Sequence, residues 1–148
     1  MLSKATVGLL LGLLSWAAFS AADTAASERS AMRAFLERSI ASATSFEDRF
    51  DAEVWLFDMQ TRLTPFMPDP EERVQFLTLV HREALAADLP PELVLALIEV
   101  ESHFDQFAVS RAGAQGYMQV MPFWKDEIGR SEDNLTRSDT NLRYGCKI

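Results

Sequence analysis

Proline positions and helical apolar spacing constrain the fold of this chain more than any other feature of its sequence. Three prolines interrupt the pattern between Thr64 and Pro70, and the pair Pro90 and Pro91 interrupts it again. Between these breaks, apolar residues recur every three or four positions, and no alternation of apolar and polar residues is long enough for a strand. The sequence therefore predicts an all-α fold whose helices are bounded by the prolines.

Four helices are expected in the first two thirds of the chain. The first two span about residues 27–40 and 46–63, and the third begins at Asp69 and Pro70, a typical N-cap and first-turn pair. The fourth begins at the second proline pair and ends near Phe104. The residues expected to face the core are Phe50, Val54, Phe57 and Leu63 in the second helix and Val74, Leu77, Val80 and Leu85 in the third.

Residues 1–22 have the pattern of a secretory signal peptide. Lys4 precedes an apolar run from Val7 to Leu14, and small residues lead to a cleavage point before Asp23. An uncleaved membrane anchor is the alternative, but the run is short for a hydrocarbon core about 30 Å thick. We therefore expect an exported, periplasmic protein.

Composition and charge narrow the class of protein. A hydrophobic content of 48% is ordinary for a globular domain, and a net charge of −8 argues against nucleic-acid binding. The proline-rich break divides a helical N-terminal segment, 23–68, from a second unit, 69–148. Cys146 is the single cysteine and is expected to be buried, while His81 and His103 are expected on a surface or helix face. No metal site and no cofactor is predicted.

Two glutamates close the predicted fourth helix, in "ALIEVESHFDQ" (Ala96–Gln106). At about 100° per residue, Glu99 lies nearly opposite Glu101. Glu101 shares its stripe with three apolar residues, Val94, Leu97 and Ile98. Burial of a carboxylate raises its pKa, which suits a general acid near neutral pH. Glu101 is thus a candidate acid, although this helix alone favours a structural carboxylate paired with an arginine or with backbone amides.

The stretch "SRAGAQGYMQVMPFW" (Ser110–Trp124) follows this helix. Gly113 and Gly116 permit positive φ or close approach of a ligand to the backbone. The Gln119 amide can both donate to and accept from sugar hydroxyl and acetamido groups. Flat faces for pyranose rings are offered by Tyr117, Phe123 and Trp124. A helix-connecting turn with core aromatics is the alternative, but acid, glycines and amide together favour the rim of a glycan cleft.

Three ordered blocks carry a family resemblance. They are "VES" (Val100–Ser102), "SRAGAQGYMQVMP" (Ser110–Pro122) and "DNLTRSDTNLRYG" (Asp133–Gly145). Through them the segment Leu89–Ile148 resembles the catalytic domain of bacterial lytic transglycosylases of the soluble lytic (SLT) type, relatives of goose-type lysozyme. Tyr117 departs from the family's usual Leu. The resemblance implies a lysozyme-like helical domain, of which 69–148 forms the N-terminal part.

The resemblance also implies roles for individual residues. Glu101 is expected to be the sole catalytic acid/base, with Ser102 supporting the turn that follows it. Ser110 is expected to orient the glutamate, and Met118 and Gln119 to line the sugar subsites. Two further residues are expected to be structural, Asn134 and Asn141.

The implied substrate is the peptidoglycan glycan strand, cleaved between N-acetylmuramic acid and N-acetylglucosamine with formation of 1,6-anhydro ends. The muramic acetamido group can stabilise the anomeric carbon, so a second carboxylate is not required. Asp105 is left out because it would lie beside Glu101, four positions on along one helix face. The alternatives are a degenerate, non-catalytic glycan-binding or scaffold protein of this family and a plain helical periplasmic protein.

The last residues, "TNLRYGCKI", open another helix with Leu142 and Cys146 on one face. The resemblance implies further helices, one of them bringing a tyrosine to the catalytic glutamate. We therefore expect this face to have no partner, the cleft to lack one wall, and the activity of the 148-residue chain to be weak or absent.

Overall fold

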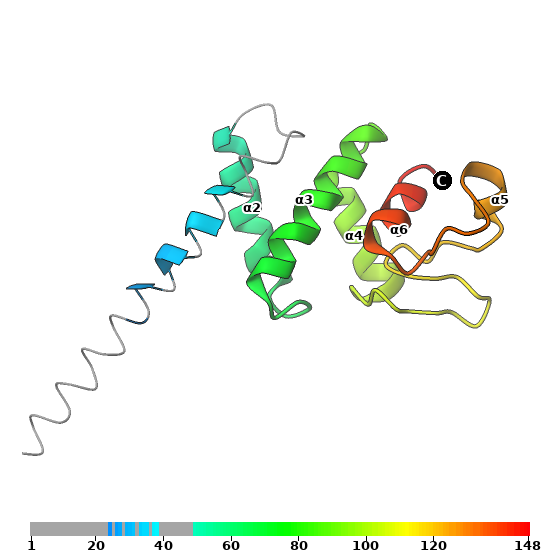
Figure 1. The fold of residues 1–148 in the computed structure, drawn as a ribbon, viewed down its shortest axis with the longest axis horizontal. Helices are drawn as coiled ribbons and strands as arrows, with labels where there is room; N and C mark the ends of the chain where they lie inside the picture. Colours follow the sequence, from blue (N-terminus) through cyan, green and yellow to red (C-terminus); the bar gives the residue numbers. More distant parts are fainter. Residues whose placement is uncertain (1–23, 25, 28, 32, 36, 39–48) are drawn as a thin grey trace, which may run out of the picture. The chain divides into compact units, whose positions relative to one another are not determined.

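The computed structural model describes residues 49–148 and, within 24–38, all residues except 25, 28, 32 and 36 (Figure 1). The chain divides into two compact units, Met1–Arg38 and Ser39–Ile148. The described residues of 24–38 are helical, in agreement with the first predicted helix, whereas the predicted signal peptide lies outside the described residues. In the described part of the chain, no helix combines the length and apolar character needed to cross a bilayer.

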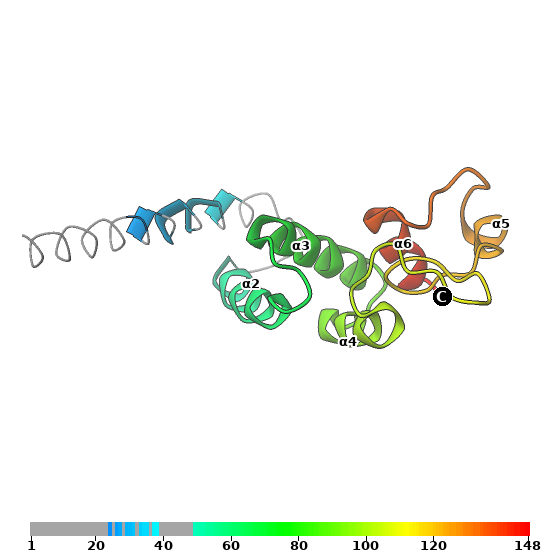
Figure 2. The same cartoon turned by 90° about the horizontal axis from the view of Figure 1, so that it is seen from below.

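The second unit contains five helices within its described residues: α2 (Arg49–Leu63), α3 (Pro70–Ala86), α4 (Pro91–Ser102), α5 (Trp124–Ile128) and α6 (Ser138–Gly145). Figures 1 and 2 show α3 in the middle of this unit, where it contacts α2, α4 and α6. Over residues 49–148 the chain forms isolated β-bridges but no strand. The all-α prediction is confirmed.

The central helix α3 begins as its sequence predicts. The Asp69 side chain caps it by accepting hydrogen bonds from the backbone N–H groups of Glu71 and Glu72, at 2.8 and 2.9 Å. Of the α3 residues expected to face the core, Leu85 is 47% exposed, so the prediction for Leu85 is wrong. Ala84 is buried instead, because it continues the row of Leu77 and Val80 at helical spacing, whereas Leu85 lies one position off that row.

The predicted core face of α2 is mostly wrong. Phe50, Val54 and Phe57 are 71%, 54% and 67% exposed. The buried row is Ala52, Leu56 and Leu63. This helix carries two apolar rows at helical spacing, and the row that contains the small Ala52 lets α3 approach closely. Periodicity alone does not rank two such rows.

The proline-rich connection between α2 and α3 lies inside the second unit. Arg73 is buried and its Nη1 donates hydrogen bonds to the carbonyl oxygens of Met67 and Pro68, at 2.5 and 2.9 Å. The boundary predicted at 68/69 therefore runs through a compact unit rather than between two. The physical reason is that α2 buries its Ala52 row against α3.

A second polar link joins α2 to α4. The indole Nε1 of Trp55 donates to Glu92 Oε1 at 2.6 Å, and the Trp55 ring meets the His81 ring edge-on, with centroids 5.1 Å apart. His81 lies on α3 as expected but is buried rather than on the surface. Burial lowers the pKa of His81, and the charge of Glu92 opposes that shift.

The C-terminal helix α6 is packed rather than unpartnered. Leu142 and Cys146 are buried, and α6 contacts α3, so the expectation of an uncovered face is wrong. Cys146 is a small buried hydrophobe, as predicted. Burial, followed by the charge of Glu83, raises the pKa of the Cys146 thiol to about 11.

Candidate functional site

Glu101 lies in the last turn of α4, and its side chain is exposed. The predicted core-facing position is therefore wrong. The buried face of α4 includes Leu95 as well as Val94 and Ile98, while Leu97 is 41% exposed. At about 100° per residue, this shifts the centre of the buried face away from Glu101, which is left at its edge. No described residue forms a hydrogen bond or ion pair with the Glu101 carboxylate.

An exposed apolar row runs along α4 beside Glu101. Its members are spaced by three or four residues, and the most exposed is Val100 at 82%. The row consists of Leu93, Leu97 and Val100. The glutamate thus borders open apolar surface rather than the helical core.

The end of α4 is fixed by a buried aromatic side chain. His103 and Phe104 both adopt the left-handed conformation, with φ of 55° and 61°. The Phe104 ring is buried against Phe66 and Phe76, with centroids 4.7 and 6.1 Å away. Burial of this ring holds two residues in a conformation that is otherwise costly.

The left-handed turn also separates Asp105 from the helix face that carries Glu101. Because α4 ends at Ser102, the two carboxylates are not neighbours on one helix face, and that part of the sequence argument is wrong. Asp105 Oδ1 instead accepts a hydrogen bond from the Phe107 backbone N–H at 2.8 Å. The Ser102 hydroxyl donates to the carbonyl oxygen of Ile98 at 3.2 Å.

The glycine-rich loop after α4 requires its glycines for different reasons. Gly116 has φ of 73°, and an added Cβ would collide with the side-chain amide of Asn141 and the Leu135 carbonyl oxygen. Gly113 has φ of 93°, but a Cβ there would meet nothing within 4 Å. Of the two uses that the sequence allows for these glycines, both adopt positive φ, and only Gly116 also needs the missing side chain for space.

Asn141 connects this loop to α6. Its side chain is completely buried, and Nδ2 donates to the carbonyl oxygens of Gln115 and Leu135, both at 2.8 Å. Its Oδ1 accepts from the Met118 backbone N–H, also at 2.8 Å. The predicted structural role of Asn141 is confirmed.

Asn134 also has the predicted structural role. Its Oδ1 accepts hydrogen bonds from the backbone N–H and the hydroxyl of Thr136, at 2.9 and 2.8 Å. This side-chain turn shapes the loop that precedes α6.

Two predicted substrate-binding residues lie in the hydrogen-bonded loop. The Ser110 hydroxyl accepts from the Ala114 backbone N–H at 3.0 Å. Gln119 has φ of 48°, and its Nε2 donates to the carbonyl oxygens of Gly116 and Ala108, at 3.0 and 3.3 Å. Within residues 49–148, no hydrogen bond joins Ser110 or Gln119 to Glu101.

Met118 and Tyr117 are core residues. Met118 is 7% exposed and packs against α6, where a Cβ on Gly145 would collide with its sulfur atom. Tyr117 is 3% exposed, with its ring 4.7 Å from that of Phe76, so it presents no face to a sugar and that prediction is wrong. Burial, followed by the charge of Glu72, raises the pKa of Tyr117 to about 12.

Phe123 and Trp124 differ from Tyr117. Phe123 is 54% exposed and Trp124 is half-buried. From the sequence, a sugar-binding face is expected of all three aromatic residues, but in the structure only Phe123 and Trp124 are accessible.

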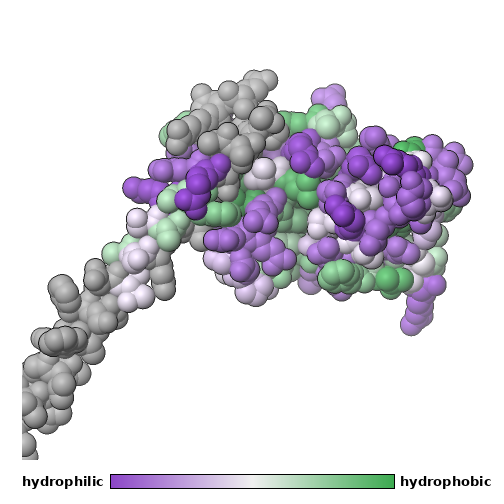
Figure 3. Space-filling model, viewed as in Figure 1, coloured by the Kyte–Doolittle hydropathy of each residue, from purple (hydrophilic) through white to green (hydrophobic). Residues whose placement is uncertain are grey.

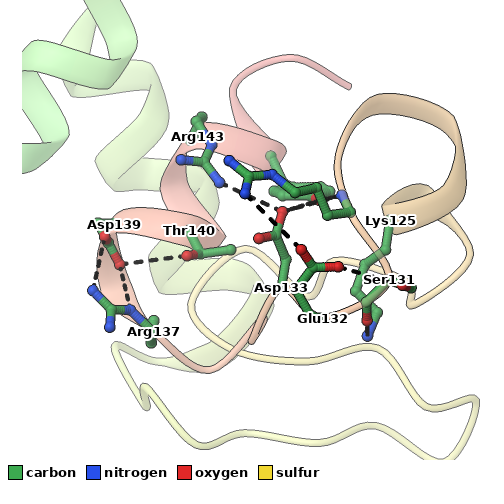
Figure 4. A network of polar contacts seen from close by, with 10 residues as sticks. Lys125, Ser131, Glu132, Asp133, Arg137, Asp139, Thr140 and Arg143 are labelled. Atoms are coloured by element: carbon green, nitrogen blue, oxygen red, sulfur yellow. Dashed lines mark hydrogen bonds and ion pairs between the residues drawn. The ribbon is translucent and has the colours of Figure 1, made fainter.

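A polar network holds the loop between α5 and α6 (Figure 4). The Tyr144 hydroxyl donates to Asp133 Oδ2 at 2.6 Å and accepts from the Arg130 backbone N–H at 3.2 Å. Arg143 forms an ion pair with the same carboxylate at 3.6 Å. The hydrogen bond from Tyr144 is the main cause that lowers the pKa of Asp133, while burial and Asp133 raise that of Tyr144. In the view of Figure 3, hydrophilic residues dominate the surface around α5 and α6.

Two residues that shape the site carry no signal in the sequence. Gln106 Nε2 donates to the Thr136 carbonyl oxygen at 2.9 Å, which ties the start of the loop to the segment before α6. Tyr144 stood inside the third motif, but nothing in its spacing indicated the hydrogen bond to Asp133. Both contacts join segments that the fold alone brings together.

A groove of about 200 Å³ opens between α2 and α4, away from Glu101. Its charged lining includes Glu92, Glu99 and Arg62. Its apolar lining consists of Met59, Leu63, Phe66, Leu95, Ala96 and Phe104. Among the described residues, no three histidine, cysteine, aspartate or glutamate side chains are grouped so that they could hold a metal ion.

Comparison with known proteins finds a family model that matches the C-terminal part of the chain. Residues 78–148 match the family model described as the transglycosylase SLT domain. This range contains all three sequence blocks that carry the resemblance. No solved structure matches the chain significantly.

Three curated relatives share one stretch with this chain. They are the membrane-bound lytic murein transglycosylases C of Actinobacillus pleuropneumoniae serotype 5b (strain L20), serotype 3 (strain JL03) and serotype 7 (strain AP76). Each is 48% identical over 48 residues, which is 32% of this chain. The matched stretch spans only 13% of the length of each relative.

Proposed function

Because residues 78–148 belong to the SLT-type transglycosylase family, we propose that this chain cleaves peptidoglycan glycan strands between N-acetylmuramic acid and N-acetylglucosamine. The observation that carries the proposal is the position of Glu101. It lies within the matched range, in the last turn of α4, with an accessible carboxylate. A catalytic acid must reach the glycosidic oxygen, and this position permits it.

The proposed reaction uses one carboxyl group twice. Protonated Glu101 donates its proton to the glycosidic oxygen, the bond from the muramic C1 to that oxygen breaks, and the acetamido carbonyl oxygen stabilises C1. The Glu101 carboxylate then takes the proton of the muramic O6 hydroxyl as O6 bonds to C1. The products are a 1,6-anhydro end and a free N-acetylglucosamine hydroxyl, and no water is consumed.

A bound glycan would complete the surroundings of Glu101. Sugar rings placed over the open carboxylate and the exposed Val100 would exclude water from the reacting atoms. The Gln119 side chain, whose Nε2 is already bonded to the loop, keeps its carbonyl oxygen for an N–H or hydroxyl of the glycan.

One observation favours a second candidate function, glycan binding without cleavage. No described residue orients the Glu101 carboxylate by a hydrogen bond, and catalytic groups are normally held in place by such partners. A degenerate family member that retains the loop and its Asn141 anchor would still bind a glycan.

Mass spectrometry of digested sacculi separates the two candidates. The parent chain should release muropeptides with 1,6-anhydro ends, and Glu101→Gln should release almost none while still binding sacculi in a sedimentation assay. Equal binding without cleavage by both proteins would favour the non-catalytic candidate. Products with reducing ends would indicate hydrolysis instead.

We also propose that the protein works in the cell envelope, where its substrate lies. The relatives that match are named as membrane-bound, and residues 1–22 have the pattern of an export signal. Fractionation followed by N-terminal sequencing tests this: a mature chain beginning near Asp23 in the periplasm is expected, whereas Met1 retained in the membrane fraction would indicate an anchor.

A further inference from the structure

Phe123 and Trp124 form an accessible aromatic pair at the start of α5. Their ring centroids are 5.2 Å apart and their planes are tilted by 33°, so the two rings contact each other. Phe123 is 54% exposed, whereas Tyr117, Phe76 and Phe104 are all buried. Near the glycine-rich loop, this pair offers the flat apolar surface that the core aromatics do not.

The pair is held rigidly. Trp124 packs against the hydrophobic core and contacts the Phe123 ring. The backbone turn beneath is closed by hydrogen bonds from the N–H groups of Trp124, Lys125 and Asp126 to the carbonyl oxygens three residues earlier, all at 3.1 Å. A ligand that covers Phe123 would therefore order little that is not already ordered, which reduces the entropy cost of binding.

The pair is also close in the chain to the proposed sugar site. Only Val120, Met121 and Pro122 separate Phe123 from Gln119, and four residues span at most about 14 Å. Val120 is buried and exchanges two backbone hydrogen bonds with Gln115, both at 3.0 Å, so this connection is part of the loop scaffold. A glycan of several sugars that passes Gln119 can reach the Phe123 ring.

We propose that Phe123, supported by Trp124, is a stacking subsite for a further pyranose ring of a β-linked amino-sugar chain. The axial C–H groups on one face of such a ring form an apolar patch that matches an aromatic face. The exposed carboxylates of Asp126 and Glu127 on α5 can accept hydrogen bonds from the ring hydroxyls. The proposal rests on the proposed glycan substrate and adds a specific subsite to it.

The test measures binding of chitotetraose, a β-linked amino-sugar oligomer, in the Glu101→Gln background so that nothing is cleaved. Titration by calorimetry gives the affinity. Phe123→Ala should weaken binding by about tenfold, the order of one lost stacking contact. Phe123→Tyr should restore affinity, because it keeps the aromatic face.

A matched control is Phe57→Ala on α2, which removes a side chain that is 67% exposed. It should leave the affinity unchanged. Unaltered thermal melting of each variant shows that the fold is intact, as expected for exposed side chains.

The possible outcomes separate the subsite from the proposed function. If Phe123→Ala binds chitotetraose as tightly as its background, or if Phe57→Ala weakens binding equally, the subsite is wrong while glycan binding stands. If neither chitotetraose nor sacculi bind to the chain with Phe123 intact, the proposed function fails together with the subsite. Weakened binding of Phe123→Ala with rescue by tyrosine supports the subsite.

Discussion

The end of α4 and the glycine-rich loop contribute to the proposed site in opposite ways. Glu101 is exposed and has no hydrogen-bond partner among the described residues. The loop is fixed by the completely buried Asn141, which makes three hydrogen bonds of 2.8 Å to it and to the segment before α6. The reactive group and the scaffold are therefore separable. The first should tolerate change without loss of stability, and the second should not.

The largest expected effect comes from Glu101→Gln. Removal of the titratable proton should lower the rate of glycan cleavage by about 10²- to 10⁴-fold, the usual contribution of a general acid. The melting temperature should stay within about 1 °C of the parent, since surface substitutions of this kind change stability little. Turnover of sacculi and thermal melting are measured on the same preparations.

Glu99→Gln is the matched control, since Glu99 is also exposed on α4 but lies on its other side. Its cleavage rate should equal that of the parent. Loss of activity in both variants would mean that the negative charge of the helix end, rather than the acid at Glu101, is what matters.

Asn141→Ala should have the largest effect on stability. The substitution removes the partner of the Met118 N–H and of the Leu135 carbonyl oxygen, whereas the Gln115 carbonyl oxygen keeps its hydrogen bond from the Val120 N–H. Buried polar groups left without a partner are costly. We expect the free energy of unfolding in urea to fall by about 3 kcal/mol. Asn134→Ala, which removes an exposed turn contact, should cost about 1 kcal/mol and serves as the comparison. Equal losses would contradict the anchoring role of Asn141.

Gly113 and Gly116 should differ in how much stability they lose when each is replaced by alanine. Gly116→Ala meets both a positive φ and a collision with Asn141, so it should lower the unfolding free energy by about 2 kcal/mol. Gly113→Ala meets only the positive φ, and about 1 kcal/mol is expected. The difference between their urea midpoints is the measurement. A larger loss at Gly113 would show that space around Gly116 is not limiting.

The sequence predicted the helices well because their signals are local. Asp69 with Pro70 marks a helix start whatever packs nearby, and the Pro90–Pro91 pair does the same for α4. Which face of a helix is buried is not local. In α2, helical spacing predicts that the row of Phe50 is buried, whereas packing against α3 buries the row of Ala52.

The dependence on tertiary packing also explains which parts of the candidate site could be predicted from the sequence. The structural role of Asn141 is implied by the family resemblance, and the positive φ of Gly116 is one that glycine adopts readily. The exposure of Glu101 depends on how far the buried face of α4 extends toward Leu95, which only tertiary packing decides. Tyr117 and Phe123 could not be separated either, since an aromatic ring serves a core and a binding surface equally well.

The smallest expected effect tests the edge of the scaffold, where Tyr144 meets Asp133. Tyr144→Phe removes the hydrogen bond of 2.6 Å to this carboxylate and should lower the melting temperature by only a few degrees near neutral pH.

The effect should depend on pH. The pKa of Asp133 is lowered in the fold mainly by that hydrogen bond. The stabilisation by the Asp133 carboxylate is therefore complete above the pKa of the unfolded state and is lost as the pH falls through the pKa of the folded state. The pKa of Tyr144 is raised in the fold by burial and by Asp133. The Tyr144 phenol therefore stabilises the fold below its pKa in the unfolded state, and this stabilisation is lost as the pH rises through its pKa in the folded state.

The difference in melting temperature between parent and variant should therefore be largest around neutral pH and shrink in acid and in strong alkali. Asp139, whose pKa is lowered chiefly by its hydrogen bond with Arg137, remains in both proteins, so its acid titration cancels in the comparison. A melting difference that stays constant from pH 3 to pH 11 would show that the ring packing of Tyr144, rather than its hydroxyl, holds this loop to α6.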